Sequence, residues 1–277
     1  MDQGLIINTA FTGAVSDNSR NSNVPYSTEE IVADTVECVS MGTSMGHFHV
    51  RDENGHASCD DQRYGELFES IRNTPQTEKL IIIASTSGRH GQTLDQRAAV
   101  LKLPAEIRPD MASLTLSSLN FQTGASVNQP DDIRALAAIM LENDIKPELE
   151  IFDLGMVTFA RQLIHEGLVE APYYFNFILG NIAGADVSLL HIAALVESLP
   201  DESVISIGAI GKCQLQANTL ALGCAHGVRV GLEDNLWMDK NKCPATNAML
   251  TERISRMATI AGRAPIGIND ARSILCL

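Results

Sequence analysis

The sequence predicts an α/β fold, a (β/α)8 or TIM barrel, and three observations support this prediction. Short runs rich in β-branched and aromatic residues alternate with helical patterns about eight times along the chain. The chain has 277 residues, a length typical of such a barrel, and neither a linker nor a change of composition divides it. We therefore expect residues 1–277 to form a single TIM-barrel domain. An open doubly wound sheet is the alternative, but the turn after the first strand, F-T-G-A-V-S, lacks the G-x-G-x-x-G pattern of a dinucleotide-binding turn.

Each predicted strand is followed by a predicted helix. In the first half, the strands cover residues 5–10, 44–50, 80–85 and 111–116, and the helices cover residues 27–42, 62–73, 93–103 and 131–143. Ser27 or Thr28 can cap the first helix, and the glutamates that follow suit the positive end of its dipole. The second half repeats this plan, with strands at 147–152, 173–179, 203–208 and 227–230 and helices at 156–166, 188–198, 214–225 and 245–262.

Composition excludes several classes of function. The net charge is −14 without any basic run, which argues against binding to nucleic acid or to anionic membranes. An anionic substrate would therefore need positive charge gathered within its site. The six cysteines include no C-x-x-C pair, the N-terminus lacks a basic region of the signal-peptide type, and no apolar stretch approaches the length that spans a bilayer. We expect a cytoplasmic protein with reduced thiols.

Two histidines stand at the end of the second predicted strand, in the segment G-H-F-H-V-R-D at residues 46–52. Side chains alternate between the two faces of a strand, so His47 and His49 point the same way and Phe48 points the other way. In a barrel the pair would face the axis at the C-terminal mouth, where active sites of this fold lie. Two imidazoles on one face supply two of the three protein ligands of a catalytic zinc site. The alternative is a pair of histidines satisfied by hydrogen bonds in a polar layer.

A third ligand can come from G-V-R-V-G-L-E-D-N, residues 227–235, which leaves the last predicted strand at the same mouth. Glu233 and Asp234 are adjacent acids there, and two histidines with one glutamate form a known catalytic zinc pattern. Arg229 should share a face with one of these acids, and beside Asp234 it would keep a general base ionised and oriented. The alternatives are a solvated pair of surface acids and a structural ion pair.

Two more strand ends carry small polar residues. The segment S-T-S-G, which begins at Ser85, suits donation of backbone N–H groups to an anion, although a plain turn would look the same. In the fourth strand, Ser113, Thr115 and Ser117 alternate onto one face. Their hydroxyls can line a site, or they can form a wet layer of the core.

Strands five and seven also end in charged residues. Glu150 and Glu148 share a face of strand five, and an inward acid there would need an arginine or histidine partner; otherwise these acids face solvent. The segment G-A-I-G-K at residues 208–212 ends strand seven. Gly211 and Lys212 are therefore candidates for binding a phosphate-bearing cofactor, because loops at this place in a barrel often hold phosphate. An ordinary glycine turn is the alternative.

Taken together, the motifs resemble those of the β-keto acid cleavage enzyme family, whose best-known activity is 3-keto-5-aminohexanoate cleavage. They follow the family's order and spacing and cover nearly the whole chain: G-H-F-H-V-R-D, L-I-I-I-A-S-T-S-G, D-M-A-S-L-T-L-S-S-L-N-F, K-P-E-L-E-I-F-D-L-G-M, F-N-F-I-L-G, G-A-I-G-K and R-V-G-L-E-D-N. H-x-H alone is a weak indication, whereas the set is specific.

The resemblance implies a TIM barrel, a homotetramer, and a reaction of a β-keto acid with acetyl-CoA that gives acetoacetate and a new acyl-CoA. It implies a Zn²⁺ ion held by three residues, a general base paired with an arginine, and four residues around the substrate. In this chain these are, in turn, His47, His49 and Glu233; Asp234 with Arg229; and Ser85, Ser113, Thr115 and Glu150.

Some positions depart from the family pattern. Members that act on an amino-substituted keto acid carry an acid just after T-G-A in the first loop, where this chain has Val15. Strand four has Ser113 and Thr115 in place of Thr and Asn, and the strand-seven loop has Lys212 and Cys213 in place of Arg and Trp. The loss of the acid predicts a keto acid with an uncharged or weakly polar side chain.

Two other functions compete with this one. A metal-dependent hydrolase of the TIM-barrel type also uses H-x-H, but on its first strand and with histidines at later strand ends, which this sequence lacks. A non-catalytic metal-binding barrel would have no need to keep a base and an arginine beside the candidate ligands.

Overall fold

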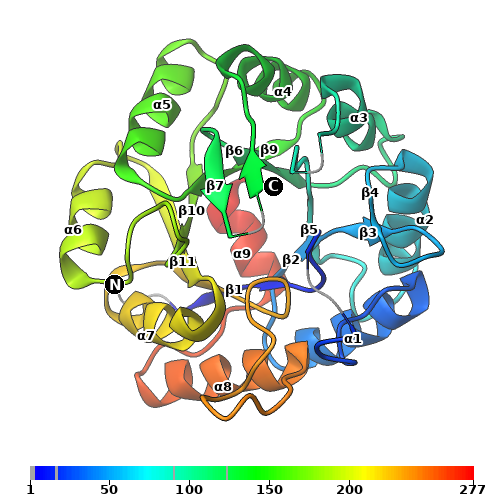
Figure 1. Cartoon of the computed structure of the whole chain (residues 1–277), viewed down its shortest axis with the longest axis vertical. Helices are drawn as coiled ribbons and strands as arrows, with labels where there is room; N and C mark the ends of the chain where they lie inside the picture. Colours follow the sequence, from blue (N-terminus) through cyan, green and yellow to red (C-terminus); the bar gives the residue numbers. More distant parts are fainter. Residues whose placement is uncertain (1–3, 16–17, 90, 123) are drawn as a thin grey trace.

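Eight parallel strands close into a barrel in the computed structural model, which describes residues 4–15, 18–89, 91–122 and 124–277. The strands follow the order β1-β12-β11-β10-β9-β6-β5-β2 around the barrel, and Figure 1 looks into it. Their bounds are β1 (Ile6–Ala10), β2 (Met45–Phe48), β5 (Ile81–Ala84), β6 (Met111–Thr115), β9 (Lys146–Ile151), β10 (Tyr173–Leu179), β11 (Ser203–Ala209) and β12 (Gly227–Val230). The predicted (β/α)8 barrel is confirmed.

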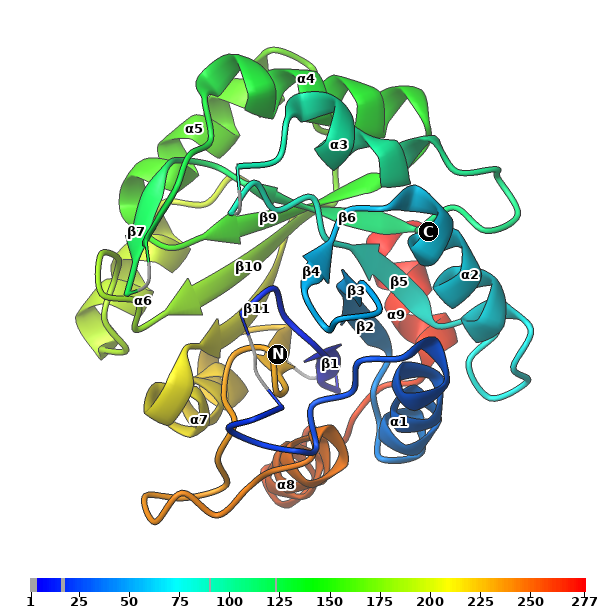
Figure 2. The same cartoon turned by 45° about the vertical axis from the view of Figure 1, so that its right-hand side comes forward.

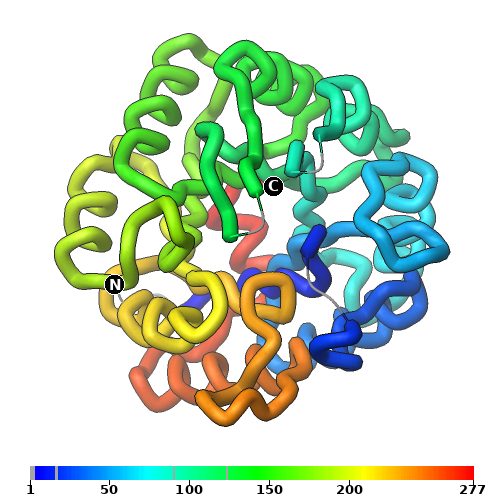
Figure 3. The backbone as a smooth tube through the Cα atoms, viewed as in Figure 1, coloured from blue at the N-terminus to red at the C-terminus, as the bar shows by residue number. Residues whose placement is uncertain are grey.

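Helices surround the barrel, as the tube in Figure 3 traces. They are α1 (Thr28–Ser40), α2 (Asp61–Arg72), α3 (Leu94–Ala98) with a 3-10 turn η1 (Ala99–Lys102), α4 (Pro130–Glu142), α5 (Leu154–His165), α6 (Leu189–Glu197), α7 (Gln214–Cys224) after a 3-10 turn η2 (Gly211–Cys213), and α8 (Asn247–Ile260). Ser27 caps α1: its hydroxyl accepts from the N–H of Glu30, whose carboxylate accepts from the N–H of Ser27. This reciprocal pair explains why the helix begins where the sequence predicted.

One further helix, α9 (Ile268–Leu275), was not predicted. It lies behind the barrel in Figure 1, at the end opposite the hairpin of β7 (Leu119–Phe121) and β8 (Gly124–Ser126). Ala271 and Leu275 pack on apolar side chains from the N-terminal ends of the strands, among them Ile6, Met45 and Ile81. An apolar spacing of three and four residues was present in this short segment. The helix therefore seals the floor of the barrel.

Two antiparallel hairpins, also not predicted, follow the C-terminal ends of barrel strands and rise over the mouth (Figure 2). One consists of β3 (Val50–Arg51) and β4 (Ala57–Ser58), directly after β2. The other consists of β7 (Leu119–Phe121) and β8 (Gly124–Ser126), after β6. These strands of two or three residues are too short for a periodic pattern to reveal them.

Strand alternation separates an apolar outer layer from a polar interior. On β10, Phe175 and Phe177 pack in the main core under the helices, where burial of each such ring contributes roughly 1.5–3 kcal/mol. Asn176, between them, lies on the opposite face and is fully buried. Polar side chains thus line the inside of the barrel above the apolar floor. Among the described residues, no helix has both the length and the apolar character needed to cross a membrane.

Candidate active site

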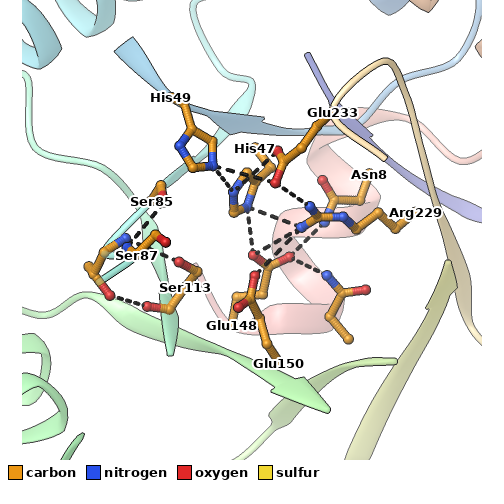
Figure 4. Close-up of polar contacts among 12 residues, drawn as sticks. Asn8, His47, His49, Ser85, Ser87, Ser113, Glu148, Glu150, Arg229 and Glu233 are labelled. Atoms are coloured by element: carbon orange, nitrogen blue, oxygen red, sulfur yellow. Dashed lines mark hydrogen bonds and ion pairs between the residues drawn. The ribbon is translucent and has the colours of Figure 1, made fainter. Parts of the chain in front are cut away.

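His47 and His49 point into the barrel from the end of β2, and both are buried. Phe48 faces outward, where it stacks on Phe11 with ring centroids 5.1 Å apart. The two faces are therefore divided as the alternation predicted. The Nε2 atoms of the two imidazoles are 3.4 Å apart, so both rings present the same nitrogen to one point (Figure 4).

The loop after β12 brings Glu233 to this point. Gly231 turns the chain with a φ of +140°, and a Cβ there would come within 2.2 Å of the carbonyl oxygen of Ala10. Gly13, in the loop after β1, lies against Glu233, since a Cβ at Gly13 would meet the Cγ of that glutamate at 2.6 Å. Two glycines thus allow the β1 and β12 loops to pack closely enough for the carboxylate to face the histidines.

The three side chains form a compact set of ligands. Glu233 Oε1 lies 3.4 Å from His49 Nε2, and its Oε2 lies 3.6 Å from His47 Nε2. The set His47, His49 and Glu233 could hold a metal ion. A second set, His47 with Glu148 and Glu150, also has its ligand atoms close together, but it shares His47 with the first.

Glu148 supports His47 from behind. Its Oε2 lies 2.8 Å from His47 Nδ1, and its Oε1 accepts hydrogen bonds from the side-chain amides of Asn8 (2.8 Å) and Asn176 (2.9 Å). A carboxylate at Nδ1 places the proton on that nitrogen, so the lone pair of Nε2 faces Glu233 and His49. Glu148 therefore fixes the tautomer that a metal ligand requires.

Arg229 is the hub of the acidic groups, and its side chain is almost fully buried. Its Nε donates to Asp234 Oδ2 at 2.8 Å, and its Nη2 contacts Glu233 Oε1 at 2.8 Å. Its Nη1 lies 3.8 Å from Glu150 and 3.9 Å from Glu148. One guanidinium thus serves four carboxylates, which leaves the site with an excess of negative charge.

The electrostatics of the two acids in the β12 loop differ. Burial would raise the pKa of Glu233, but Arg229 and the two histidines outweigh it and hold that pKa well below its usual range. For Asp234, burial raises the pKa above its ordinary value despite the opposing charge of Arg229. Glu233 is therefore a permanent anion, whereas Asp234 is the stronger proton acceptor of the pair.

The histidines differ in a similar way. Burial opposes protonation of both, and for His49 it dominates, so the pKa of that imidazole is lowered. For His47 the carboxylates of Glu233 and Glu148 overcome burial and the charge of Arg229, so its pKa is raised. The lowered pKa of His49 favours its neutral form, which is the form of an imidazole that binds metals.

The other predicted substrate residues surround this center. Thr115 donates to Glu150 Oε2 at 2.6 Å, and burial raises the pKa of that glutamate. Ser85 lines the same small cavity as His49, and the hydroxyl of Ser113 accepts from the N–H of Thr86 at 3.1 Å. Both serines are labelled in Figure 4. Glu148 and Glu150 both face inward and have Arg229 near them, as the pattern of strand five predicted for inward acids.

The backbone N–H groups of two predicted segments are engaged within the chain. The N–H groups of Ser85, Thr86 and Ser87 already donate, to a carbonyl of β2 and to two serine hydroxyls, so they are not open to an anion. The N–H of Gly211 likewise donates to the carbonyl of Asp234 at 2.7 Å, which ties the β11 loop to the β12 loop. Sequence spacing does not reveal such contacts, because they join loops far apart in the chain. Lys212 is exposed.

Comparison with known proteins shows the family of this chain. The model of a family described as beta-keto acid cleavage enzyme matches residues 4–277. The chain belongs to the β-keto acid cleavage enzyme family. It is thus an acyl-transferring enzyme of the class that cleaves carbon–carbon bonds of β-keto acids.

Named relatives of this β-keto acid cleavage enzyme act on different keto acids. The chain is 34% identical to the 3-keto-5-aminohexanoate cleavage enzyme of Fusobacterium nucleatum, over all of this chain and 99% of that protein. It is 33% identical to the 3-oxoadipate:acetyl-CoA acetyltransferase of Cupriavidus necator, over all of this chain and 96% of that protein. A solved structure titled as a ternary complex of ObcA shares the fold, with a TM-score of 0.81 at 22% identity, over 92% of this chain and 68% of that one.

Sequence reasoning missed several residues of this family member's site. Asn8 and Asn176 stand at inward positions of β1 and β10. For Asn176, a polar residue between two phenylalanines was the available signal, whereas Asn8 is followed by the polar Thr9. Glu148 was placed on the face of Glu150 but given no role. Arg89, beyond the S-T-S-G segment, was not singled out. Of the other histidines, His90 lies outside the described residues, and His226 accepts the N–H of Ile205 through its Nδ1.

Proposed function

We propose that this protein is a zinc-dependent β-keto acid cleavage enzyme that condenses a β-keto acid with acetyl-CoA and releases acetoacetate and a new acyl-CoA. The observation that carries the proposal is the convergence of His47, His49 and Glu233 next to the Asp234–Arg229 pair. The first group can hold a metal, and the second can hold a base beside it.

The three candidate ligands fit zinc. In a tetrahedral site with bonds of about 2.0–2.1 Å, neighbouring ligand atoms lie about 3.3–3.4 Å apart. The Nε2 atoms of His47 and His49 are 3.4 Å apart, and the two oxygens of Glu233 lie 3.4 Å from His49 and 3.6 Å from His47, one oxygen to each imidazole. A divalent cation would also offset the excess of carboxylates around Arg229. When bound, the metal would supply Lewis acidity toward the keto and carboxylate oxygens of the substrate.

The residues of the chain account for the remaining steps. Asp234 removes a proton from C2 of the keto acid, and this carbon attacks the acetyl carbonyl of acetyl-CoA, which expels the CoA thiolate. The thiolate then adds to the original keto carbon. The bond between that carbon and C2 breaks, a new acyl-CoA leaves, and the acetoacetate fragment recovers a proton from Asp234. Arg229 holds both oxygens of Asp234 and so fixes its orientation throughout.

Four further residues would bind the keto acid: Ser85, Ser113, Thr115 and Glu150. The hydrogen bond between Thr115 and Glu150 orients the carboxyl group of the latter toward the interior. On the β11 loop, Lys212 is exposed and can meet a phosphate group of acetyl-CoA, while Gly211 holds this loop to the carbonyl of Asp234.

Three expectations about the whole protein remain predictions. One domain over residues 1–277 follows from the sequence pattern, and a cytoplasmic location follows from the cysteine content. A homotetramer is supported by apolar side chains exposed within residues 182–190, namely Ile182, Leu189 and Leu190.

Incubation of the zinc-loaded protein with acetyl-CoA and a pool of β-keto acids tests the function. Mass spectrometry should detect acetoacetate and a new acyl-CoA in equal amounts. Acetyl-CoA left intact with every member of a broad pool would refute the transferase, and the same pool would then be searched for hydrolysis products.

A further inference from the structure

Arg89 lies at the mouth of the barrel, in the loop after β5. Its guanidinium carbon stacks 3.4 Å above the centroid of the Phe121 ring, on the β7–β8 hairpin that rises over the mouth. Phe121 is itself held edge-on by Phe152, with centroids 5.7 Å apart, just after the end of β9. Two aromatic rings therefore fix the position of this cation.

The charge of Arg89 is directed toward the acidic center. Burial lowers the pKa of Arg89, and the negative charges of Glu233, Glu150 and Asp234 oppose this shift. Each of these three acids already contacts the guanidinium of Arg229 within 4 Å. Among the residues that the structure describes, none forms an ion pair with Arg89. A half-buried guanidinium at this place is thus available to an anion from outside the chain.

The geometry favours a planar anion. A guanidinium stacked on a ring keeps its N–H donors free at its edge, and this edge matches the two oxygens of a carboxylate. In the proposed reaction, the carboxylate next to the keto group binds at the metal site. An anion at Arg89 would therefore be a second carboxylate, at the far end of the keto acid. The pantetheine arm of acetyl-CoA keeps its phosphates many bonds away from the reacting thioester, which makes them a poorer match for a cation so near the acids.

We propose that Arg89 is a specificity-determining residue that binds a terminal carboxylate, so that the preferred substrate is a β-keto dicarboxylic acid. The inference rests on the proposed function. It replaces the expectation of an uncharged side chain, which considered only Val15. That residue is exposed in the loop after β1, and its lack of charge removes a partner for a cationic substrate, whereas Arg89 adds a partner for an anionic one.

Two keto acids of equal length test the proposal: 3-oxoadipate, which ends in a carboxylate, and 3-oxohexanoate, which ends in a methyl group. The zinc-loaded enzyme would be assayed with each at saturating acetyl-CoA, as would Arg89→Gln, Arg89→Lys and a matched control. Arg256→Gln is that control, since it removes the same charge from an exposed position on α8. We expect Arg89→Gln to lower kcat/KM for 3-oxoadipate on the order of 10- to 100-fold, the value of a charge-assisted hydrogen bond.

The same variant should leave kcat/KM for 3-oxohexanoate within about threefold, and Arg89→Lys, which keeps the charge, should lose less than Arg89→Gln. An equal loss with both keto acids would overturn the proposal and assign Arg89 to balancing the acids of the site. A rise in KM for acetyl-CoA with no change for the dicarboxylate would assign it to a phosphate. Should acyl-CoA form from the methyl-ended acid alone, only this inference fails; if no keto acid gives acyl-CoA, the proposed function fails.

Discussion

Replacing Glu148 with glutamine tests how the site fixes the tautomer of His47. The carboxylate now accepts from His47 Nδ1 through one oxygen and from two asparagine amides, of Asn8 and Asn176, through the other. Glutamine keeps the shape but has only one acceptor. If its oxygen faces the asparagines, its NH2 group faces Nδ1, and His47 must move its proton to Nε2, away from the tautomer that binds metal. If its oxygen faces Nδ1, its NH2 group meets two other donors.

Either arrangement carries a cost that can be worked from these contacts. An unsatisfied buried donor costs about 1–3 kcal/mol, and loss of a carboxylate behind a histidine ligand lowers metal affinity about 10- to 100-fold. We therefore expect Glu148→Gln to weaken Zn²⁺ binding by about 1.4–2.7 kcal/mol, the same range expressed as free energy.

Competition with a chromogenic chelator would measure the affinity. Glu150→Gln is the matched control, because it removes the same charge from the same face of β9, while Glu150 bonds to Thr115 and not to His47 Nδ1. The control variant should lose less than about threefold in Zn²⁺ affinity, because it removes only the electrostatic attraction between the carboxylate and the ion. Unchanged affinity in Glu148→Gln, or an equal loss in Glu150→Gln, would refute the account based on the tautomer.

Three more predictions follow from the structure. Asp234→Asn should lower kcat about 10²- to 10⁴-fold at unchanged zinc content, since it removes the base but keeps an acceptor for Arg229; steady-state kinetics with metal analysis would check this, and normal turnover would exclude Asp234 as the base. Gly13→Ala should weaken zinc binding at least about tenfold by displacing Glu233, whereas Gly223→Ala, whose Cβ would meet nothing within 4 Å, should not; equal affinities would contradict the packing argument. Burial raises the pKa of Asp34 to about 6, so its proton stabilises the fold fully below the unfolded pKa near 4, and this stability is lost as pH rises through 6. Asp34→Asn should thus gain about 2.4 kcal/mol in unfolding free energy relative to the parent between pH 4 and pH 7, as urea titrations at both values would show, and a constant difference would refute the shift.

The repeating part of the fold could be predicted because each unit carries its own local pattern. The strand of residues 173–179 and the cap of α1 at Ser27 lie where hydrophobic alternation and capping chemistry predicted them. Helix α9 and the two hairpins were not predicted, because their positions depend on contacts with strands that are distant in the sequence. For α9 these contacts are with residues such as Ile6 and Ile81, far away in the sequence.

The candidate site was predictable to the same degree. Residues two apart on one strand, such as His47 and His49, must share a face, and the position of Glu233 followed from the closure of the ring. The residues that position the candidate ligands were harder to predict. The role of Asn8 and Asn176 depends on the closed barrel, which brings both side-chain amides to one oxygen of Glu148. The position of Arg89 likewise depends on the hairpin, which places the ring of Phe121 beneath its guanidinium.

The seam between β1 and β12 has a consequence for assembly. This pairing joins Ile6 to Gly227 and Thr9 to Val230, from opposite ends of the chain, so we expect this contact of high sequence separation to form late in folding. The candidate metal ligands lie on both sides of it, with His47 on β2 and Glu233 after β12. A partly formed barrel therefore cannot bring all three candidate ligands together. An ion that binds the three ligands stabilises the closed barrel by mass action. Loss of the ion would first loosen the barrel along this line, where amide exchange should quicken before it does on β9 and β10.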